Sequence, residues 1–121
     1  MKPLRPNDSD IFFALAIAFA EGVGVRKNLA KAVECLKMAA EMKHAAATYF
    51  LGYCYSEGLG VPNLDYKKAF QCFETAAKAN VPEAMTALAF CYSHGLGVKR
   101  DNDKAFRFYT EAAKRGMLLL N

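Results

Sequence analysis

The sequence predicts an all-α fold, a right-handed α/α superhelix (solenoid) of three helical hairpins plus the start of a fourth. The motif Gly-x-Gly-Val occurs three times, at residues 22–25, 58–61 and 95–98, so its copies are 36 and 37 residues apart. The dipeptides Lys-Ala and Ala-Ala follow each copy in the same frame, and apolar residues around them recur at helical spacing. Because one helical hairpin cannot bury its own apolar face, three hairpins in tandem are expected to stack side by side.

The composition is that of one globular domain. The 121 residues are 54% hydrophobic and 23% charged, which is too apolar for a disordered chain. The longest apolar run, residues 11–20, ends at Glu21 and is about half of what a membrane-spanning helix needs, so no membrane insertion is expected. The prediction is therefore a single repeat domain over residues 1–121, with repeat 1 at about 9–43, repeat 2 at about 44–80, repeat 3 at about 81–116 and a partial next helix at 117–121.

The first helix of each hairpin is clearest in the second repeat, where the pattern predicts it from about Ala45 to Glu57. Leu51 belongs to the apolar face, and Gly52 beside it lets the partner helix approach closely. Gly58 stands where a helix needs a left-handed residue at its carboxyl end, and Gly60 permits a second sharp change of direction. The sequence thus predicts a helix that ends in a glycine turn, after which the chain reverses its direction.

The second helix of each hairpin is predicted from its capping residues. Side chains of the Asn, Asp type accept a hydrogen bond at helix amino ends, and the expected N-caps are Asn28, Asp65 and either Asp101 or Asn102. After the second of these helices, Asn80 tolerates the left-handed conformation and Pro82 suits the first turn of the next helix. Gly116 is expected to close the third hairpin, so that residues 117–121 begin a fourth.

The complete pattern resembles the Sel1-like repeat, a relative of the tetratricopeptide repeat, over about residues 9 to 116. The second repeat carries it nearly in full, at Ala47, Leu51, Gly52, Tyr55, Gly58, Gly60, Val61, Asp65, Lys68, Ala69, Ala76 and Ala77. The third repeat departs from it at Ala89, and the first at Ile11, Ala16 and Phe19. The resemblance implies an α-solenoid that acts as a scaffold or adaptor, without a cofactor.

The four cysteines are expected to be free. Cys35 with Cys72, and Cys54 with Cys91, occupy equivalent positions in neighbouring repeats, about 9–10 Å apart in packed helices and too far for a disulfide. No Cys-x-x-Cys pair suits zinc. One secreted subgroup of the resembled family staples each hairpin with a cysteine pair, but the matching positions here hold Ala40 with Thr48 and Ala77 with Met85. Mostly buried thiols, together with an amino end that lacks a secretory pattern, predict a cytoplasmic protein.

No motif predicts catalysis, a metal or a nucleotide. The glycine loops lack a preceding strand and a Gly-x-Gly-x-x-Gly continuation. His44 and His94 stand alone and suit local capping roles, and no serine has an activating partner in its motif. The net charge is only +4, and the basic residues of 99–115 alternate with acidic ones, which is typical of a solvated helix face and not of a nucleic-acid surface.

A partner-binding surface is expected on the concave face, which first helices line in such superhelices. The positions that the hairpin core does not use differ between repeats, and many are aromatic. The predicted partner-binding residues are Phe13, Ile17, Tyr49, Tyr53, Ser56, Thr86, Phe90, Ser93 and His94. The alternative is that these rings pack between adjacent first helices; Tyr53 and Phe90, in the middle of the groove, best fit a binding role.

The predicted function is a non-enzymatic scaffold or adaptor that binds a peptide or protein segment on this face. Two alternatives stay open. The chain is a self-associating structural module, in which the apolar residues 117–120 stack on the amino-terminal face of another copy. Or it is a ligand-binding or hydrolytic relative of the cysteine-rich members of the resembled family.

Overall fold

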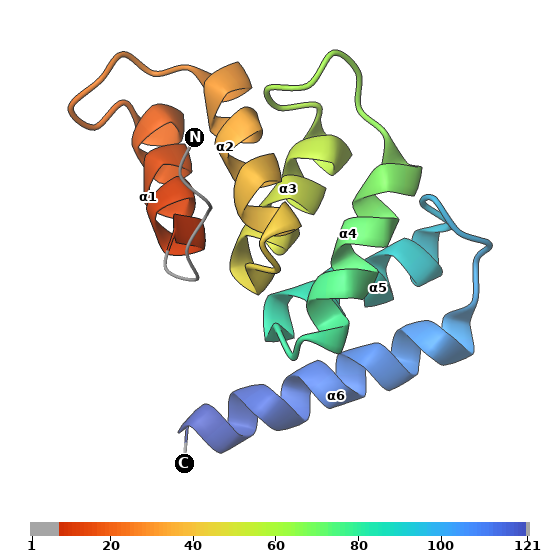
Figure 1. The fold of residues 1–121 in the computed structure, drawn as a ribbon. Coiled ribbons are helices and arrows are strands. Elements are labelled where there is room, and N and C mark those ends of the chain that lie inside the picture. Colours follow the sequence, from red (N-terminus) through yellow and green to blue (C-terminus); the bar gives the residue numbers. More distant parts are fainter. Residues whose placement is uncertain (1–7, 121) are drawn as a thin grey trace.

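The computed structural model describes residues 8–120, with the side chains of residues 8–116, and over that range it contains helices and no strand. The predicted all-α solenoid is confirmed. The helices follow one another from one end of the array to the other (Figure 1). They are α1 (Asp8–Glu21), α2 (Leu29–Glu41), α3 (Ala45–Glu57), α4 (Tyr66–Lys78), α5 (Pro82–His94) and α6 (Asn102–Leu120).

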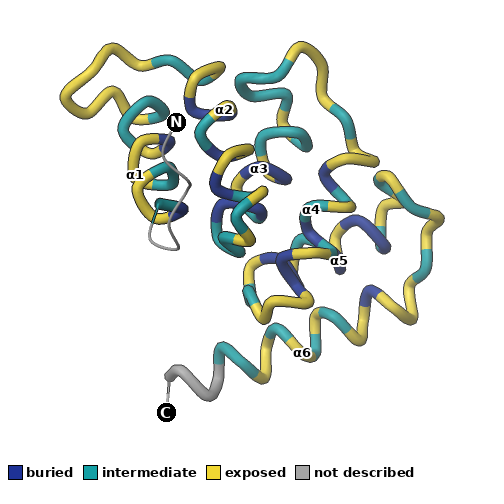
Figure 2. The backbone as a smooth tube through the Cα atoms, in the orientation of Figure 1, coloured by how far each residue is buried: buried dark blue, intermediate teal, exposed yellow. Residues whose placement is uncertain are grey.

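Each helix packs mainly against its neighbours in the chain. The pairs α1–α2, α3–α4 and α5–α6 form the hairpins, and α2–α3 and α4–α5 join one hairpin to the next. One apolar cluster, which includes Val33, Leu36 and Leu51, fills the first junction, and a second, which includes Phe73 and Leu88, fills the other. Figure 2 shows that most buried positions lie in α2 to α5, whereas the described parts of α1 and α6 contain few.

Local hydrogen bonds begin the helices where the sequence predicts. The side-chain oxygens of Asn28, Asp65 and Asp101 each accept from the backbone N–H three residues later, at 3.0, 3.1 and 3.1 Å. Asp101, and not Asn102, is therefore the N-cap of α6. His44 caps α3, because its Nδ1 accepts from the Ala47 N–H at 3.1 Å. Each cap satisfies an amide that would otherwise lack a partner within the helix.

The second glycine of each inner motif fixes how neighbouring repeats meet. Gly60 has a left-handed φ of 68°, and a Cβ there would overlap the carbonyl oxygen of Leu29 at the start of α2. Likewise, a Cβ on Gly97 would overlap the carbonyl oxygen of Tyr66 at the start of α4. Each loop therefore rests directly on the backbone of the preceding repeat, and only glycine permits so close an approach.

One predicted boundary is wrong. We expect a turn at Gly116 and a separate fourth helix after it, but α6 continues through Gly116 to Leu120. No described atom lies within 4 Å of where a Cβ of Gly116 would be, so no packing partner favours a turn there. A glycine inside a helix costs only about 1 kcal/mol relative to alanine, which the helix tolerates.

Candidate functional site

Two adjoining hollows open on the side formed by the first helices, and together we call them the first-helix groove. The α1–α3 hollow, of about 290 Å³, is lined by residues that include Phe13, Ile17, Glu21, Leu36, Phe50 and Tyr53. The α3–α5 hollow, of about 460 Å³, is lined by residues that include Tyr49, Tyr53, Ser56, Glu83, Thr86 and Phe90. Tyr53 lines both hollows, so it lies where they meet.

Three large apolar side chains follow the groove from repeat to repeat. Ile17, Tyr53 and Phe90 occupy equivalent positions in α1, α3 and α5, and they are 41%, 45% and 49% exposed. The second helices cover the core positions of α1, α3 and α5. Ile17, Tyr53 and Phe90 are not among these core residues, so the second helices leave them exposed. An exposed apolar row of this kind, bordered by hollows, suits contact with another chain.

Phe13 and Tyr49 lie deeper than the row. The Phe13 ring centroid is 4.6 Å from that of His44 and 5.7 Å from that of Phe50. The Tyr49 ring is 5.8 Å from that of Phe73. Both residues are half-buried, so they combine the two roles weighed from the sequence: they pack between helices and also form walls of the hollows.

The predicted polar residues divide between the groove and its edge. Ser56 and Thr86 line the α3–α5 hollow, and Ser56 Oγ donates to the Tyr53 carbonyl oxygen at 2.8 Å. Ser93 Oγ donates to the Phe90 carbonyl at 3.0 Å, and the His94 ring stacks on Phe90 with centroids 4.1 Å apart. Ser93 and His94 are absent from the described linings of both hollows, so they lie beside Phe90 at the edge of the groove.

Phe50 is a groove residue that the sequence analysis did not select. It is 44% exposed and lines the α1–α3 hollow opposite Phe13. The equivalent positions in the other repeats hold Ala14 and Ala87. The sequence signal for Phe50 is therefore an aromatic residue at a position that is alanine in the other two repeats.

Among the described residues, the charged side chains that line the groove are acidic. Glu21 belongs to the α1–α3 hollow and Glu57 and Glu83 to the α3–α5 hollow, and no Lys or Arg of residues 8–116 lines either hollow. Burial raises the pKa of Tyr49, and the nearby Glu83 and Tyr53 raise it further, so this phenol stays neutral and can donate a hydrogen bond. The groove therefore combines apolar walls with a negative rim.

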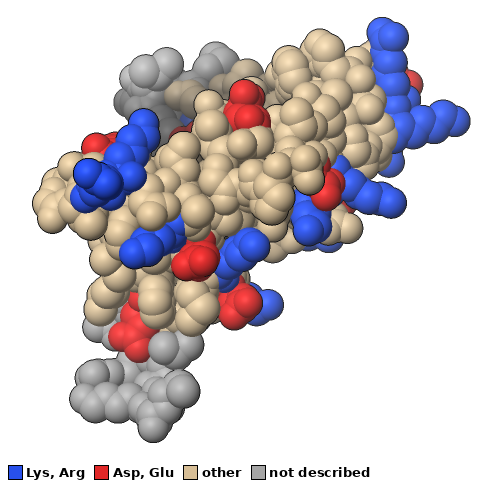
Figure 3. All heavy atoms as spheres, turned by 90° about the horizontal axis from the view of Figure 1, so that it is seen from above, with Lys and Arg blue, Asp and Glu red and all other residues tan. Residues whose placement is uncertain are grey.

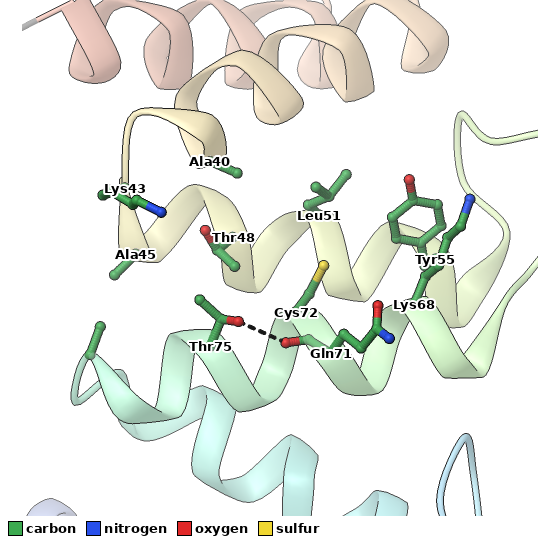
Figure 4. A pocket seen from close by; sticks show the side chains of 11 residues that line it. Ala40, Lys43, Ala45, Thr48, Leu51, Tyr55, Lys68, Gln71, Cys72 and Thr75 are labelled. Carbon is green, nitrogen blue, oxygen red and sulfur yellow. Dashed lines mark hydrogen bonds between the residues drawn. The ribbon is translucent and has the colours of Figure 1, made fainter.

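A third hollow, of about 490 Å³, is lined by α3 and α4 together with Ala40 of α2 and Lys43 of the loop before α3 (Figure 4). Lys43 and Lys68 lie at its two ends, and the Lys68 ammonium is 5.4 Å from the centre of the Tyr55 ring. Burial raises the pKa of the Cys72 thiol, which also lines it, to about 11. Such a thiol is protonated near neutral pH and is a poor nucleophile.

All four cysteines are free, as expected. Only Cys91 is buried, whereas Cys35, Cys54 and Cys72 are intermediate, so the prediction of mostly buried thiols is only partly right. Their side chains pack at the edges of the core clusters, where neighbouring helices leave one side open. Burial raises the pKa of Cys91 to about 11.

The remaining surface is mixed in charge. On the face seen in Figure 3, basic and acidic side chains are interspersed between areas without charge. Within the described part of the chain, His, Cys, Asp and Glu form no group of three or more that could hold a metal ion. In residues 8–120 no helix combines the length and apolar character that crossing a membrane requires.

Comparison with known proteins now identifies the repeats. The model of the Sel1 repeat matches residues 13–44, 45–81 and 82–117, almost the whole of the described chain. The chain belongs to the Sel1 repeat family. Members of this family generally mediate protein–protein interactions and are generally non-enzymatic scaffolds. None of the curated proteins compared with the chain matches it.

Solved structures of Sel1 repeat proteins superpose closely. A Sel1 repeat protein from Oxalobacter formigenes is 33% identical with a TM-score of 0.84, covering 89% of this chain and 44% of its own. The uropathogenic Escherichia coli protective antigen c5321 is 30% identical with a TM-score of 0.87, covering 89% and 23%. Helicobacter pylori cysteine rich protein B shares the fold alone, at 21% identity, a TM-score of 0.69 and coverage of 92% and 90%. The chain thus spans less than half of the first two proteins.

Proposed function

We propose that this Sel1 repeat chain is a non-enzymatic interaction module that binds a peptide or protein segment in the first-helix groove. The observation that carries the proposal is the row of Ile17, Tyr53 and Phe90, which are 41–49% exposed at equivalent positions of the three repeats. Exposed aromatic side chains beside pockets are the usual anchors of protein interfaces. Protein interaction is also the general role of the family.

The chemistry of the groove favours one class of partner. The two hollows can each accept an apolar side chain, because their walls are mainly aromatic and aliphatic. Glu21, Glu57 and Glu83 on the rim favour Lys or Arg in the same segment, since carboxylates without a local cation attract one. The proposed ligand is therefore a segment with two apolar anchors and at least one basic residue. The hollow between α3 and α4 differs, because lysines lie at its ends.

The test begins with peptides selected from a displayed random library on the immobilised protein. We expect the selected sequences to share apolar anchors and a net positive charge. The binding of a labelled selected peptide is then measured by fluorescence anisotropy for the wild type and for the double variant Tyr53→Ala with Phe90→Ala. Loss of two anchors should weaken binding by about 30-fold or more, because each anchor of this kind contributes at least about 1 kcal/mol.

Phe106→Ala is the matched control, because Phe106 is an even more exposed aromatic, at 72%, on α6 and outside the groove. This variant should bind the peptide like the wild type. A Glu57→Gln, Glu83→Gln variant should bind basic peptides more weakly, most clearly at low salt. If the double groove variant keeps wild-type affinity, or if the selected peptides are acidic, the groove is not the binding site.

A further inference from the structure

The hollow between α3 and α4, which we call the α3–α4 hollow, shares no lining residue with the first-helix groove. Its volume of about 490 Å³ is within the range of roughly 300–1,000 Å³ that ligand sites occupy. Leu51, Tyr55 and Cys72 form much of its apolar wall. Among the described residues, Lys43 and Lys68 are the charged side chains that line it. The proposed function makes no use of this hollow.

The next junction of the array shows which side chains fill the equivalent space elsewhere in the molecule. The repeat pairs Thr48 of α3 with Met85 of α5, and Cys72 of α4 with Phe108 of α6. Met85 is 5% exposed, and the Phe108 ring is stacked on the Tyr92 ring with centroids 5.9 Å apart and an interplanar angle of 5°. Larger side chains therefore occupy, between α5 and α6, the space that Thr48 and Cys72 leave open between α3 and α4.

Tyr55 shows most clearly what the α3–α4 hollow lacks. Tyr55 and Tyr92 are equivalent, and each has a lysine ammonium 5.4 Å from its ring centre, that of Lys68 and that of Lys104 respectively. Phe108 stacks on Tyr92, whereas no aromatic ring of the described residues stacks on Tyr55. An aromatic side chain from another protein can take this position, because the same pair of ring and ammonium already accepts one at the next junction.

The far end of the hollow differs from its counterpart in the same way. Arg115 and Asn80 are the equivalents of Ala79 and Lys43, and Arg115 Nη2 donates to Asn80 Oδ1 at 3.1 Å. This hydrogen bond connects α6 to the loop before α5. Ala79 cannot form such a bond, and within residues 8–116 the Lys43 ammonium forms no ion pair. This end of the α3–α4 hollow therefore keeps an uncompensated positive charge.

The helices around the hollow carry an excess of positive charge. Helices α2 and α4 and the loop between α2 and α3 have six basic and three acidic residues: Lys31, Lys37, Lys43, Lys67, Lys68 and Lys78, against Glu34, Glu41 and Glu74. None of these three acidic residues lines the hollow. Asp65, just before α4, is the N-cap that accepts from the backbone N–H of Lys68, and Glu57 of α3 lines the first-helix groove. The hollow thus combines an apolar wall with cations, the reverse of the groove.

We propose that the α3–α4 hollow binds a segment of a partner protein in which an aromatic residue lies between two acidic ones. The aromatic ring stacks on Tyr55, in the position that Phe108 has on Tyr92. One carboxylate pairs with Lys68 and the other with Lys43 at the opposite end (Figure 4). The occupant is a protein segment because a protein side chain fills the equivalent space between α5 and α6.

The length of the hollow sets the spacing of these residues. Its lining follows α3 from Ala45 to Tyr55, which is about 15 Å at a rise of about 1.5 Å per residue. An extended segment advances about 3.3–3.6 Å per residue, so the two acidic residues lie about four positions apart. The aromatic residue is the nearer of the two ends to the acidic residue that pairs with Lys68, because this lysine lies over the Tyr55 ring.

The experiment selects peptides from a displayed random library on the variant Tyr53→Ala with Phe90→Ala, in which the groove has lost its anchors. Counter-selection on the same variant with Cys72→Phe added removes peptides that bind elsewhere. We expect the selected sequences to contain an aromatic residue with acidic residues on both sides. Because the groove anchors are absent, this outcome does not depend on whether the proposed function is correct.

The binding of a labelled selected peptide is then measured by fluorescence anisotropy for the wild type and for Cys72→Phe. This substitution places a ring where Phe108 stands at the next junction, so the affinity should fall at least about 30-fold. Cys35→Phe is the matched control, since it adds the same ring at the equivalent position of α2, which is not part of the hollow's lining. This control should bind the peptide like the wild type.

The two lysines are tested by Lys43→Gln with Lys68→Gln, which should weaken binding by about threefold to tenfold at low salt and by less at high salt. Lys37→Gln with Lys78→Gln removes the same charge from α2 and α4 outside the lining and should bind like the wild type. Thermal melting followed by circular dichroism checks that every variant folds. Lys43 and Lys68 are exposed, so this pair tests the site even if Cys72→Phe does not fold.

Three results would overturn the proposal. The first is that no selected peptide distinguishes the hollow from its Cys72→Phe form. The second is that the selected peptides lack acidic residues or bind the double lysine variant as tightly as the wild type. The third is that the wild type self-associates in sedimentation velocity and Cys72→Phe is a monomer, because a second copy of this chain then fills the hollow.

Discussion

Phe73 of α4 and Tyr109 of α6 occupy the same position of the repeat but have opposite surroundings. Phe73 is 4% exposed and packs in the junction between α4 and α5, whereas Tyr109 is 40% exposed on the last helix. The two side chains are similar in size and lie on helices with similar patterns. The difference teaches that in a solenoid a residue joins the core only if a neighbouring repeat covers it.

The largest effect should come from removing the two rings. Phe73→Ala should lower the free energy of unfolding by about 3–5 kcal/mol, because it leaves a cavity in a filled junction. Tyr109→Ala should lower it by about 1 kcal/mol or less, because its ring already contacts water. Urea unfolding of dilute protein measures both. Equal losses would mean that the junctions are not the source of stability.

The glycines of the loops give the second contrast. Gly60→Ala and Gly24→Ala both place a side chain in the left-handed region, which costs about 1–2 kcal/mol. Only Gly60→Ala also pushes against the backbone of the preceding repeat, so we expect a further loss of about 1–3 kcal/mol. The comparison of their urea midpoints isolates the contact between repeats, because the backbone strain is common to both. A smaller loss for Gly60→Ala than for Gly24→Ala contradicts the stacking geometry.

The smallest effect, with the opposite sign, is expected at Gly116. This residue lies inside α6 with no described atom within 4 Å of a Cβ. Gly116→Ala should therefore raise stability by about 0.5–1 kcal/mol, the difference in helix propensity. Thermal unfolding followed by far-UV circular dichroism, which reports helix content, provides the measurement. A loss of stability instead would indicate that Gly116 forms the turn first predicted from the sequence.

The repeat itself explains part of the arrangement in the candidate groove. Ile17, Tyr53 and Phe90 share one register position, so the periodicity alone puts them in a row on the first helices. Phe50 was missed because no other repeat has an aromatic there. Ser93 and His94, which the sequence also predicts as binding residues, lie beside Phe90 at the edge of the groove, where the last turn of α5 brings His94 onto Phe90.

Hairpins, caps and glycine turns could be inferred from the amino-acid order alone, because each depends on hydrogen bonds and backbone angles within a few residues. The Asp65 cap and the left-handed Gly58 are examples. Only the tertiary structure decided which equivalent side chains are buried, where hollows open beside Tyr53, and that α6 passes through Gly116. Those outcomes depend on which segment packs against a given residue, and the residues next to it in the sequence do not determine that.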